Sequence, residues 1–171
     1  MIAFQGPKSI SDEVFTQWVT EYQPALLRTC RMLLHDRTLA EDAVQETFLK
    51  AYRALPSFRG SCAEKTWLMH IAVNTCRDMN KASWPRHHDR RFTPEDLPGQ
   101  AAPEEPEDTG LAASIRALPQ RLREPLLLYY DQEWTLEETA QALGISRSAV
   151  SRRLKAARSR LRAALEREEE P

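Results

Sequence analysis

The sequence lacks the features that mark membrane, secreted or strand-rich proteins. Glycine occurs only 5 times among 171 residues. No segment shows the alternation of apolar and polar residues that is typical of strands. No apolar run approaches the ~20 residues that a membrane-spanning helix needs, and the first residues do not follow the pattern of a secretory signal. We therefore expect no membrane insertion and a cytoplasmic location.

Residues that commonly build disulfides, metal centres and catalytic sites are also sparse. Cys30, Cys62 and Cys76 are widely spaced and include no CxxC pair. The neighbouring His87 and His88 fit no common ligand spacing. Clustered carboxylates and a glycine-rich phosphate loop are missing from the sequence. We expect no metal, no cofactor and no catalytic residue, so that the chain is not an enzyme.

The residues that are abundant favour helices, and their charges are unevenly distributed. Alanine, leucine, arginine and glutamate dominate, and hydrophobic residues make up 42% of the chain. The net charge is only −1, yet residues 65–91 carry a net charge of +4 and residues 147–167 one of +7. Residues 94–110 contain six acidic residues, no basic residue and four prolines. This composition is typical of an extended, self-repelling linker.

The fold that these patterns predict is all-α, with two small helical domains. The first domain covers residues 10–84, an acidic and flexible linker covers 85–110, and the second domain covers 111–167. In the first domain we expect a four-helix bundle, because Pro24 should end or kink the first helix. Thr38 and Glu41 have the spacing of a capping box that opens a later helix.

Residues 135–162 have the spacing of a helix-turn-helix motif. Thr135 opens a capping box, Ala140 is the small residue between the helices, Gly144 makes the turn, and Val150 anchors the second helix. Opposite its apolar side, that helix presents arginine, lysine and serine, which can bind guanine edges and phosphates in the major groove. These residues are Arg147, Ser148, Ser151, Arg152, Lys155, Ser159 and Arg162. A basic helix that is merely solvated, or that binds a protein, is the alternative interpretation.

Two further polar faces occur in the first domain. One helix carries a polar and basic stripe whose members recur at helical spacing, namely His70, Asn74, Arg77 and Lys81. The preceding helix has a mostly charged outer face formed by Asp42, Gln45, Glu46, Leu49 and Arg53. Judged from these residues alone, the second face is a solvated surface, and only the apolar Leu49 among the charges indicates a partner.

Four segments carry a resemblance to a known family. Residues 40–55, 57–60 and 66–74 resemble conserved region 2 of bacterial sigma factors, and residues 119–165 resemble their region 4. Because only these two regions and a short linker are present, the chain resembles the extracytoplasmic-function (ECF) group of the sigma-70 family. The resemblance covers nearly all of both predicted domains, in the order and spacing of the family.

The resemblance implies a transcription initiation factor that binds core RNA polymerase and directs it to specific promoters. Region 2 would recognise and melt the −10 element, and region 4 would read the −35 element in the major groove. The face that contains Leu49 would dock on the clamp helices of the largest polymerase subunit. Region 4 would meet the flap of the second-largest subunit. An inhibitory anti-sigma factor is a further partner that the resemblance implies.

The resemblance also implies that the −10 element is bound as a single strand, with one base flipped into a pocket beside the region 2 loop. The residues assigned to this contact are Phe58, Arg59, Gly60, Lys65, His70, Asn74, Arg77 and Lys81. Ordinary core packing is the alternative for Phe58, and it is the interpretation that we favour for Trp67. The chain departs from the family where Glu64 or Lys65 stands at the position of a common aromatic residue, and where Ser151 replaces a basic one.

Two other classes of protein share some of these features. A self-sufficient helix-turn-helix regulator would bind an operator without polymerase and usually as a symmetric dimer, but the sequence has no evident dimer seam or ligand pocket. A nucleic-acid enzyme would need the catalytic clusters that are missing.

For a sigma factor we predict weak promoter binding by the free protein, because the acidic linker competes with phosphates for the basic segments. Docking on polymerase would then raise the local concentration of both domains at the promoter.

Overall fold

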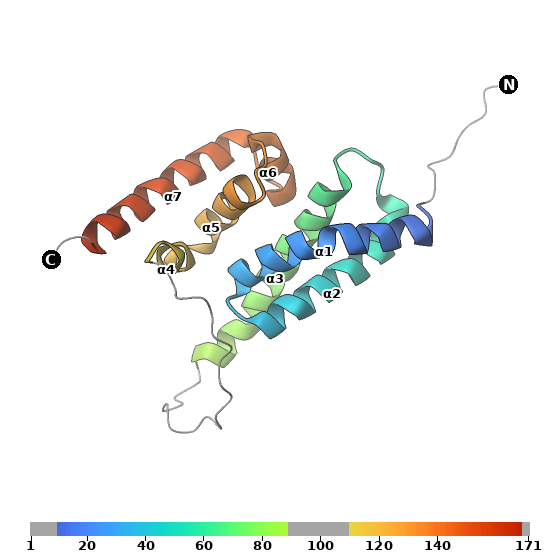
Figure 1. Cartoon of the computed structure of the whole chain (residues 1–171), viewed down its shortest axis with the longest axis horizontal. Helices are drawn as coiled ribbons and strands as arrows, with labels where there is room; N and C mark the ends of the chain where they lie inside the picture. The colour runs from blue at the N-terminus through green and yellow to red at the C-terminus, as the bar shows by residue number, and fades with distance from the viewer. Residues whose placement is uncertain (1–9, 89–109, 169–171) are drawn as a thin grey trace.

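The computed structural model describes residues 10–88 and 110–168, and within these ranges every regular element is a helix. The first unit consists of α1 (Asp12–Leu34), α2 (Arg37–Ala54) and α3 (Glu64–His88), with a short 3₁₀ turn at Leu55–Ser57. These three long helices lie along one another (Figure 1), and each contacts the other two. The expected all-α class is confirmed.

The expectation of four helices in the first unit is wrong, because α1 continues through Pro24. Proline removes one backbone hydrogen bond to the carbonyl four residues earlier, that of Thr20. Both residues are exposed, so water can solvate that carbonyl. Trp18 before the proline and Leu26 after it are buried in the same core. Packing on both sides therefore keeps the helix continuous, and the described part of this unit has three long helices.

The capping box expected at Thr38 is also wrong. Asp36 is the N-cap of α2, and its carboxylate accepts a 2.9 Å hydrogen bond from the backbone N–H of Leu39. Thr38 lies within the first turn and is exposed. Aspartate caps a helix at least as well as threonine, so the helix begins where the first good cap occurs.

The second unit has the predicted helix-turn-helix. It consists of α4 (Gly110–Ala117), α5 (Gln120–Leu126), a π-helical turn (Leu127–Asp131), α6 (Leu136–Leu143) and α7 (Arg147–Glu168). Both hydrogen bonds of the capping box at Thr135 and Glu138 are formed. Gly144 has a φ of 65°, the left-handed conformation that glycine adopts without strain, and Val150 is fully buried.

The two units pack against each other through a shared apolar core. Residues of the second unit lie in the same buried cluster as the core of the first, and they are Leu127, Leu128, Trp134, Ala142 and Leu143. The main contact is between α3 and α6, with further contacts from α1 to α5 and to the π-helical turn. A second buried cluster, which includes Leu122, Val150 and Leu154, belongs to the second unit alone.

The boundaries between the units differ slightly from the expected ones. Helix α3 extends to His88, into the segment 85–110 that we assigned to the linker, and α4 begins at Gly110. Residues 89–109, which contain the acidic residues of the predicted linker, lie outside the described residues. The flexible linker and the domain limits 10–84 and 111–167 therefore stay predictions.

Arg123 joins the ends of two helices at the contact between the units. Its side chain is buried, and its guanidinium donates hydrogen bonds to the carbonyls of Arg116 (2.6 Å), Leu118 (3.3 Å) and Leu33 (3.4 Å). These carbonyls lie at the C-terminal ends of α4 and α1, where a cation is favourable. Burial lowers the pKa of Arg123 from its usual value, and the neighbouring charge of Glu124 opposes that shift.

His35 ends α1 beside this cation. It has a φ of 54°, and its backbone N–H donates to the carbonyl of Arg31. Burial and the positive charges of Arg123 and Arg116 lower the pKa of His35 from 6.5 to about 4. The folded protein therefore holds His35 neutral at pH values where the unfolded chain would protonate it.

We predict that Thr135→Ala lowers the free energy of unfolding by about 1 kcal/mol, because an exposed N-cap hydroxyl contributes about that much. Urea denaturation followed by circular dichroism measures the change. Thr135→Ser is the matched control, since it keeps the hydroxyl and the capping box. Equal stability of the alanine and serine variants would contradict the role of this cap.

We also predict that the free energy of unfolding falls between about pH 6.5 and about pH 4, because only the unfolded state then protonates His35. The variant His35→Asn removes the titration and retains a residue that tolerates positive φ. Urea midpoints at about pH 7.5 and about pH 5 should therefore differ less for the variant than for the wild type. The same pH dependence in both proteins would show that His35 does not contribute.

Candidate nucleic-acid and polymerase interfaces

Helix α7 presents the predicted −35 residues on its outer side. It is capped by Ser146, whose hydroxyl accepts a 3.1 Å hydrogen bond from the N–H of Ala149. Val150, Leu154 and Ala157 are buried and fix the rotation of the helix about its axis. All seven predicted residues are consequently exposed: Arg147, Ser148, Ser151, Arg152, Lys155, Ser159 and Arg162. The structure thus brings this set together on one exposed helix face.

The predicted loop residues of region 2 separate into two environments. Arg59 and Gly60 are exposed, and Gly60 has a φ of 70°. Phe58 is half-buried between two tryptophans, with ring centroids 5.7 Å from Trp18 and 4.7 Å from Trp67. The core packing that we considered for Phe58 and favoured for Trp67 is present. A role of Phe58 in DNA binding stays a prediction.

Three members of the α3 stripe form a continuous hydrogen-bonded chain that ends on the second unit. The Nδ1 atom of His70 lies 2.7 Å from the carbonyl oxygen of Ala142, so this nitrogen carries a proton and donates. The other ring nitrogen, Nε2, then accepts from the amide of Asn74 at 3.2 Å. The amide oxygen of Asn74 in turn accepts from Arg77 at 3.2 Å. Because Nδ1 donates and Nε2 accepts, the ring of His70 is in the tautomer with its proton on Nδ1.

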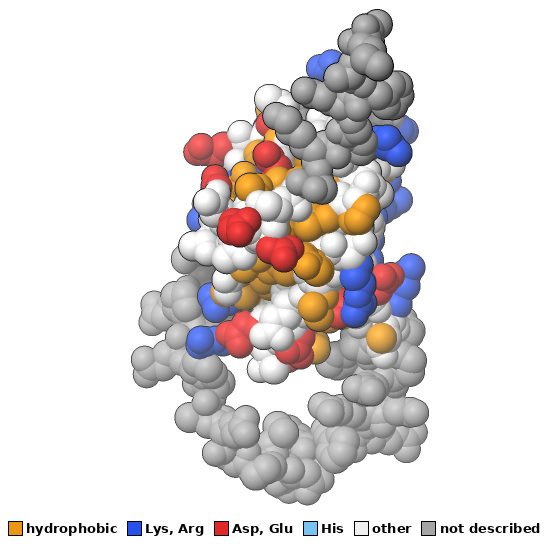
Figure 2. All heavy atoms as spheres, turned by 90° about the vertical axis from the view of Figure 1, so that its right-hand side faces the viewer, with side chains coloured by type: hydrophobic (Ala, Val, Ile, Leu, Met, Phe, Trp, Pro, Cys, Tyr) orange, Lys and Arg blue, Asp and Glu red, His pale blue; other side chains and the backbone are white. Residues whose placement is uncertain are grey.

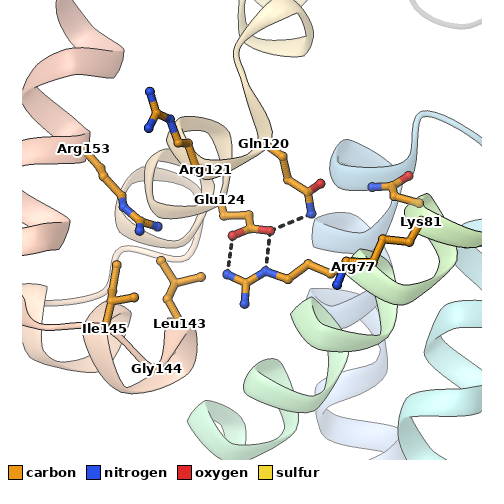
Figure 3. A pocket seen from close by; sticks show the side chains of 10 residues that line it. Arg77, Lys81, Gln120, Arg121, Glu124, Leu143, Gly144, Ile145 and Arg153 are labelled. Carbon is orange, nitrogen blue, oxygen red and sulfur yellow. Dashed lines mark hydrogen bonds and ion pairs between the residues drawn. The ribbon is translucent and has the colours of Figure 1, made fainter. Parts of the chain in front are cut away.

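Arg77 continues this chain to a buried carboxylate of α5. Its Nε and an NH₂ group donate to the two oxygens of Glu124 at 2.9 and 2.6 Å (Figure 3). Gln120 adds a third hydrogen bond to Glu124 at 2.8 Å. The Glu124 side chain is 2% exposed and that of Arg77 is 30% exposed. The hydrogen bond with Glu124 raises the pKa of Arg77, and burial opposes this shift.

A cleft of about 670 Å³ opens beside this ion pair, between α3 on one side and α5, α6 and α7 on the other. Figure 3 shows Arg121 and Arg153 on the side of the second unit, across from Lys81 on α3. Lys81 is exposed, unlike the other three members of the stripe. The stripe is therefore confirmed as one helix face, but most of it faces the second unit instead of solvent.

Two more polar contacts hold the units together at the opposite end of the interface. Arg28 of α1 donates to the carboxylate and to the backbone carbonyl of Asp131, each at 2.9 Å. The ammonium of Lys65, a predicted −10 residue, lies 5.7 Å from the ring centroid of the buried Trp134. This is the distance of a cation–π interaction.

The interface residues of the second unit were missed by sequence reasoning. Arg123 and Glu124 are charged residues inside an apolar segment, between Leu122 and Leu126. Charged residues are seldom buried unless they are paired. That unusual position was the available signal for a polar contact, although it does not identify Arg77 as the partner.

The outer face of α2 lies away from the contact between the units. Asp42, Gln45, Leu49 and Arg53 are exposed there, Glu46 is half-buried, and Leu49 is 53% exposed. Val14 and Tyr52 are further exposed apolar residues of α1 and α2, and the Tyr52 hydroxyl bonds to Asp12 at 3.0 Å. Figure 2 views the end of the molecule where α1 begins and α2 ends, and it shows hydrophobic side chains beside acidic ones.

Neither a metal cluster nor a membrane span occurs in residues 10–88 and 110–168. These ranges contain no group of three or more histidine, cysteine, aspartate or glutamate residues placed to hold a metal ion. None of their helices combines the length and the apolar character needed to cross a bilayer.

Two family models match the chain, one in each helical unit. Residues 18–85 match the family described as Sigma-70 region 2, and residues 114–163 match Sigma-70, region 4. The RNA polymerase sigma-H factor of Pseudomonas aeruginosa is 31% identical over 89% of this chain and 86% of its own length. The ECF RNA polymerase sigma factor SigM of Bacillus subtilis is 32% identical over 89% of this chain and 93% of its own length. The chain spans less than half of some longer relatives.

A solved structure shows that the likeness extends to the fold. The sigma factor RpoE from Bartonella quintana, in complex with the anti-sigma factor NepR, aligns with a TM-score of 0.70 and 25% identity. The alignment covers 89% of this chain and 96% of that one. From these matches and from its two helical units, the chain belongs to the sigma-70 family of RNA polymerase sigma factors, in the ECF group.

Proposed function

We propose that the chain is a promoter-specific transcription initiation factor in which three separate surfaces bind polymerase, the −10 element and the −35 element. The outer face of α2 binds the clamp helices of the largest polymerase subunit. The stripe on α3, with the loop at 57–60, binds the melted −10 strand. The outer face of α7 reads the −35 element in the major groove. The proposal assigns no chemical reaction to the chain and places it in the cytoplasm with the polymerase.

The observation that carries the −35 assignment is the exposed basic face of α7 on a complete helix-turn-helix. A second helix that is fixed by buried residues and exposes arginine along one side is the geometry with which this motif enters the major groove. Arg152 lies near the N-terminal end of α7, where base contacts are made, and it is exposed. Arginine there can donate two hydrogen bonds to guanine.

The polymerase assignment is supported by the exposed Leu49 among charged neighbours. Leu49 is 53% exposed, and covering this apolar side chain with a partner lowers the free energy of the complex. The charged residues around it, which include Asp42 and Arg53, can select that partner by complementary charge. RpoE of Bartonella quintana, which is bound to the anti-sigma factor NepR, supports an anti-sigma factor as a further partner of this chain.

Run-off transcription with core polymerase, this protein and fragmented DNA of its own genome tests the proposal. We predict specific transcripts only when both proteins are present, and Arg152→Ala should lower their yield about 10-fold or more, the effect of one lost arginine–guanine contact. Arg160→Ala is the matched control, because it removes an exposed charge of α7 outside the proposed face. Binding of duplex promoter DNA by the protein alone, with no transcripts, would instead indicate a polymerase-independent regulator.

We further predict that Leu49→Ala weakens binding to core polymerase without changing the free energy of unfolding, because its side chain is exposed in the free protein. Fluorescence anisotropy of the labelled protein, titrated with core polymerase, measures the affinity. Leu111→Ala removes a side chain of similar exposure (47%) from α4 and serves as the control. An unchanged affinity for the Leu49 variant would contradict the docking face.

A further inference from the structure

The cleft beside the ion pair of Arg77 and Glu124 has an excess of positive charge. Its lining includes four cations, Arg77, Lys81, Arg121 and Arg153, and one carboxylate, that of Glu124. The two charges of the ion pair compensate each other, because both oxygens of Glu124 accept from Arg77. The remaining three cations give the lining its excess charge.

These three cations are not neutralised by neighbouring carboxylates. Within residues 10–88 and 110–168, Lys81, Arg121 and Arg153 form no ion pair, whereas Arg28 and Arg147 each lie within 4.0 Å of a carboxylate. They come from α3, α5 and α7, so the fold brings them around one cleft from separate parts of the chain. A cleft lined by charges of one sign attracts counter-ions more strongly than a flat surface does. The natural occupant is therefore an anion.

An apolar wall lies next to the cations. Leu143 and Ile145 line the cleft at the turn between α6 and α7, with Gly144 between them, and Ile145 is half-buried. Figure 3 shows the side chain of Arg153 extending from α7 toward these two residues. A guanidinium stacks on flat rings, and an aliphatic side chain gains by covering them from water. This wall suits an aromatic group that is attached to the anion.

The size and charge of the cleft narrow the class of ligand further. Its volume of about 670 Å³ lies within the range of sites that hold one small molecule. A diphosphate carries a charge of roughly −3 at neutral pH, since its terminal phosphate is mostly doubly ionised, and this matches the three uncompensated cations. Each phosphate also offers several oxygens to the donors of arginine and lysine.

We propose that this cleft is a binding site for a nucleoside diphosphate or triphosphate. The phosphates lie between Lys81, Arg121 and Arg153, and the base packs against Leu143 and Ile145. The inference goes beyond the proposed function and does not depend on it, because it concerns a small molecule bound to the free protein. Only Lys81 belongs also to the predicted −10 residues, and the test therefore leaves it unaltered.

Isothermal titration calorimetry of the full chain, without DNA or polymerase, compares three probes: ADP, inorganic pyrophosphate and adenosine. Divalent cations are omitted, because they would neutralise the phosphates. We expect one saturable site for ADP, about 10-fold weaker binding of pyrophosphate, which lacks the base, and no saturable binding of adenosine over the same range of concentration. ADP should also raise the melting temperature, since a ligand that binds only the folded state stabilises it.

Variants of the lining locate the bound ADP. Arg121→Gln and Arg153→Gln should each weaken ADP binding about 10-fold, the effect of losing one charge-assisted hydrogen bond. Arg160→Gln and Arg152→Gln are the matched controls, because each removes an exposed charge of α7 outside the cleft. Both controls should bind ADP as the wild type does. Arg121 is exposed and Arg153 is half-buried, so Arg121→Gln decides if Arg153→Gln does not fold by circular dichroism.

Three outcomes would overturn the site. The first is the absence of saturable ADP binding to the wild type. The second is equal weakening by the cleft variants and by the controls, which would indicate diffuse attraction to the basic surface of α7. The third is equal affinity for pyrophosphate and ADP, which would show that the cleft holds inorganic phosphates and that its apolar wall contributes nothing. Failure of the wild type to produce transcripts with polymerase would count against the proposed function and would leave this test unaffected.

Discussion

The ion pair between Arg77 and Glu124 is the interaction on which the arrangement of the two units depends. A buried carboxylate is costly unless its charge is paired and its hydrogen bonds are complete. Glu124 meets this condition only when α3 lies against α5, because Arg77 comes from one unit and Gln120 from the other. The hydrogen bonds from Arg77 through Asn74 to His70 end on the carbonyl of Ala142 in α6, so this last bond also forms only when the two units are in contact. One buried charge therefore makes several separate polar contacts depend on one another.

The polar part of the contact differs from its apolar part in what could replace it. Ion pairs and hydrogen bonds can be exchanged for equivalent contacts with phosphates, whereas a large apolar interface has no such replacement in DNA. The apolar part of the contact, around Trp134 and Leu128, adds to the stability of this arrangement. The outer face of α2 and the basic face of α7 lie on exposed surfaces in that state. Both surfaces are thus accessible while the two units are in contact.

Local patterns in the sequence predicted the helices and the faces of the site, but not the contact between the units. The capping box at Thr135 and the turn at Gly144 have fixed spacing, so the helix-turn-helix could be recognised directly. The break expected at Pro24 was wrong because burial of Trp18 and Leu26 on either side outweighs one lost hydrogen bond. The partner of Arg77 lies 47 residues away, and helical periodicity carries no information about such a pairing. The four residues of the stripe consequently lie on one face of α3 as predicted, but their buried surroundings were missed.

A distance between the two units, measured in the free protein, tests the account most directly. Cys62 is partly exposed and Cys30 and Cys76 are buried, so spin labels on Cys62 and on Leu111→Cys would report on the two units. Pulsed electron paramagnetic resonance should give one short distance for the free protein. A broad distribution in the free protein would contradict a fixed contact between the units.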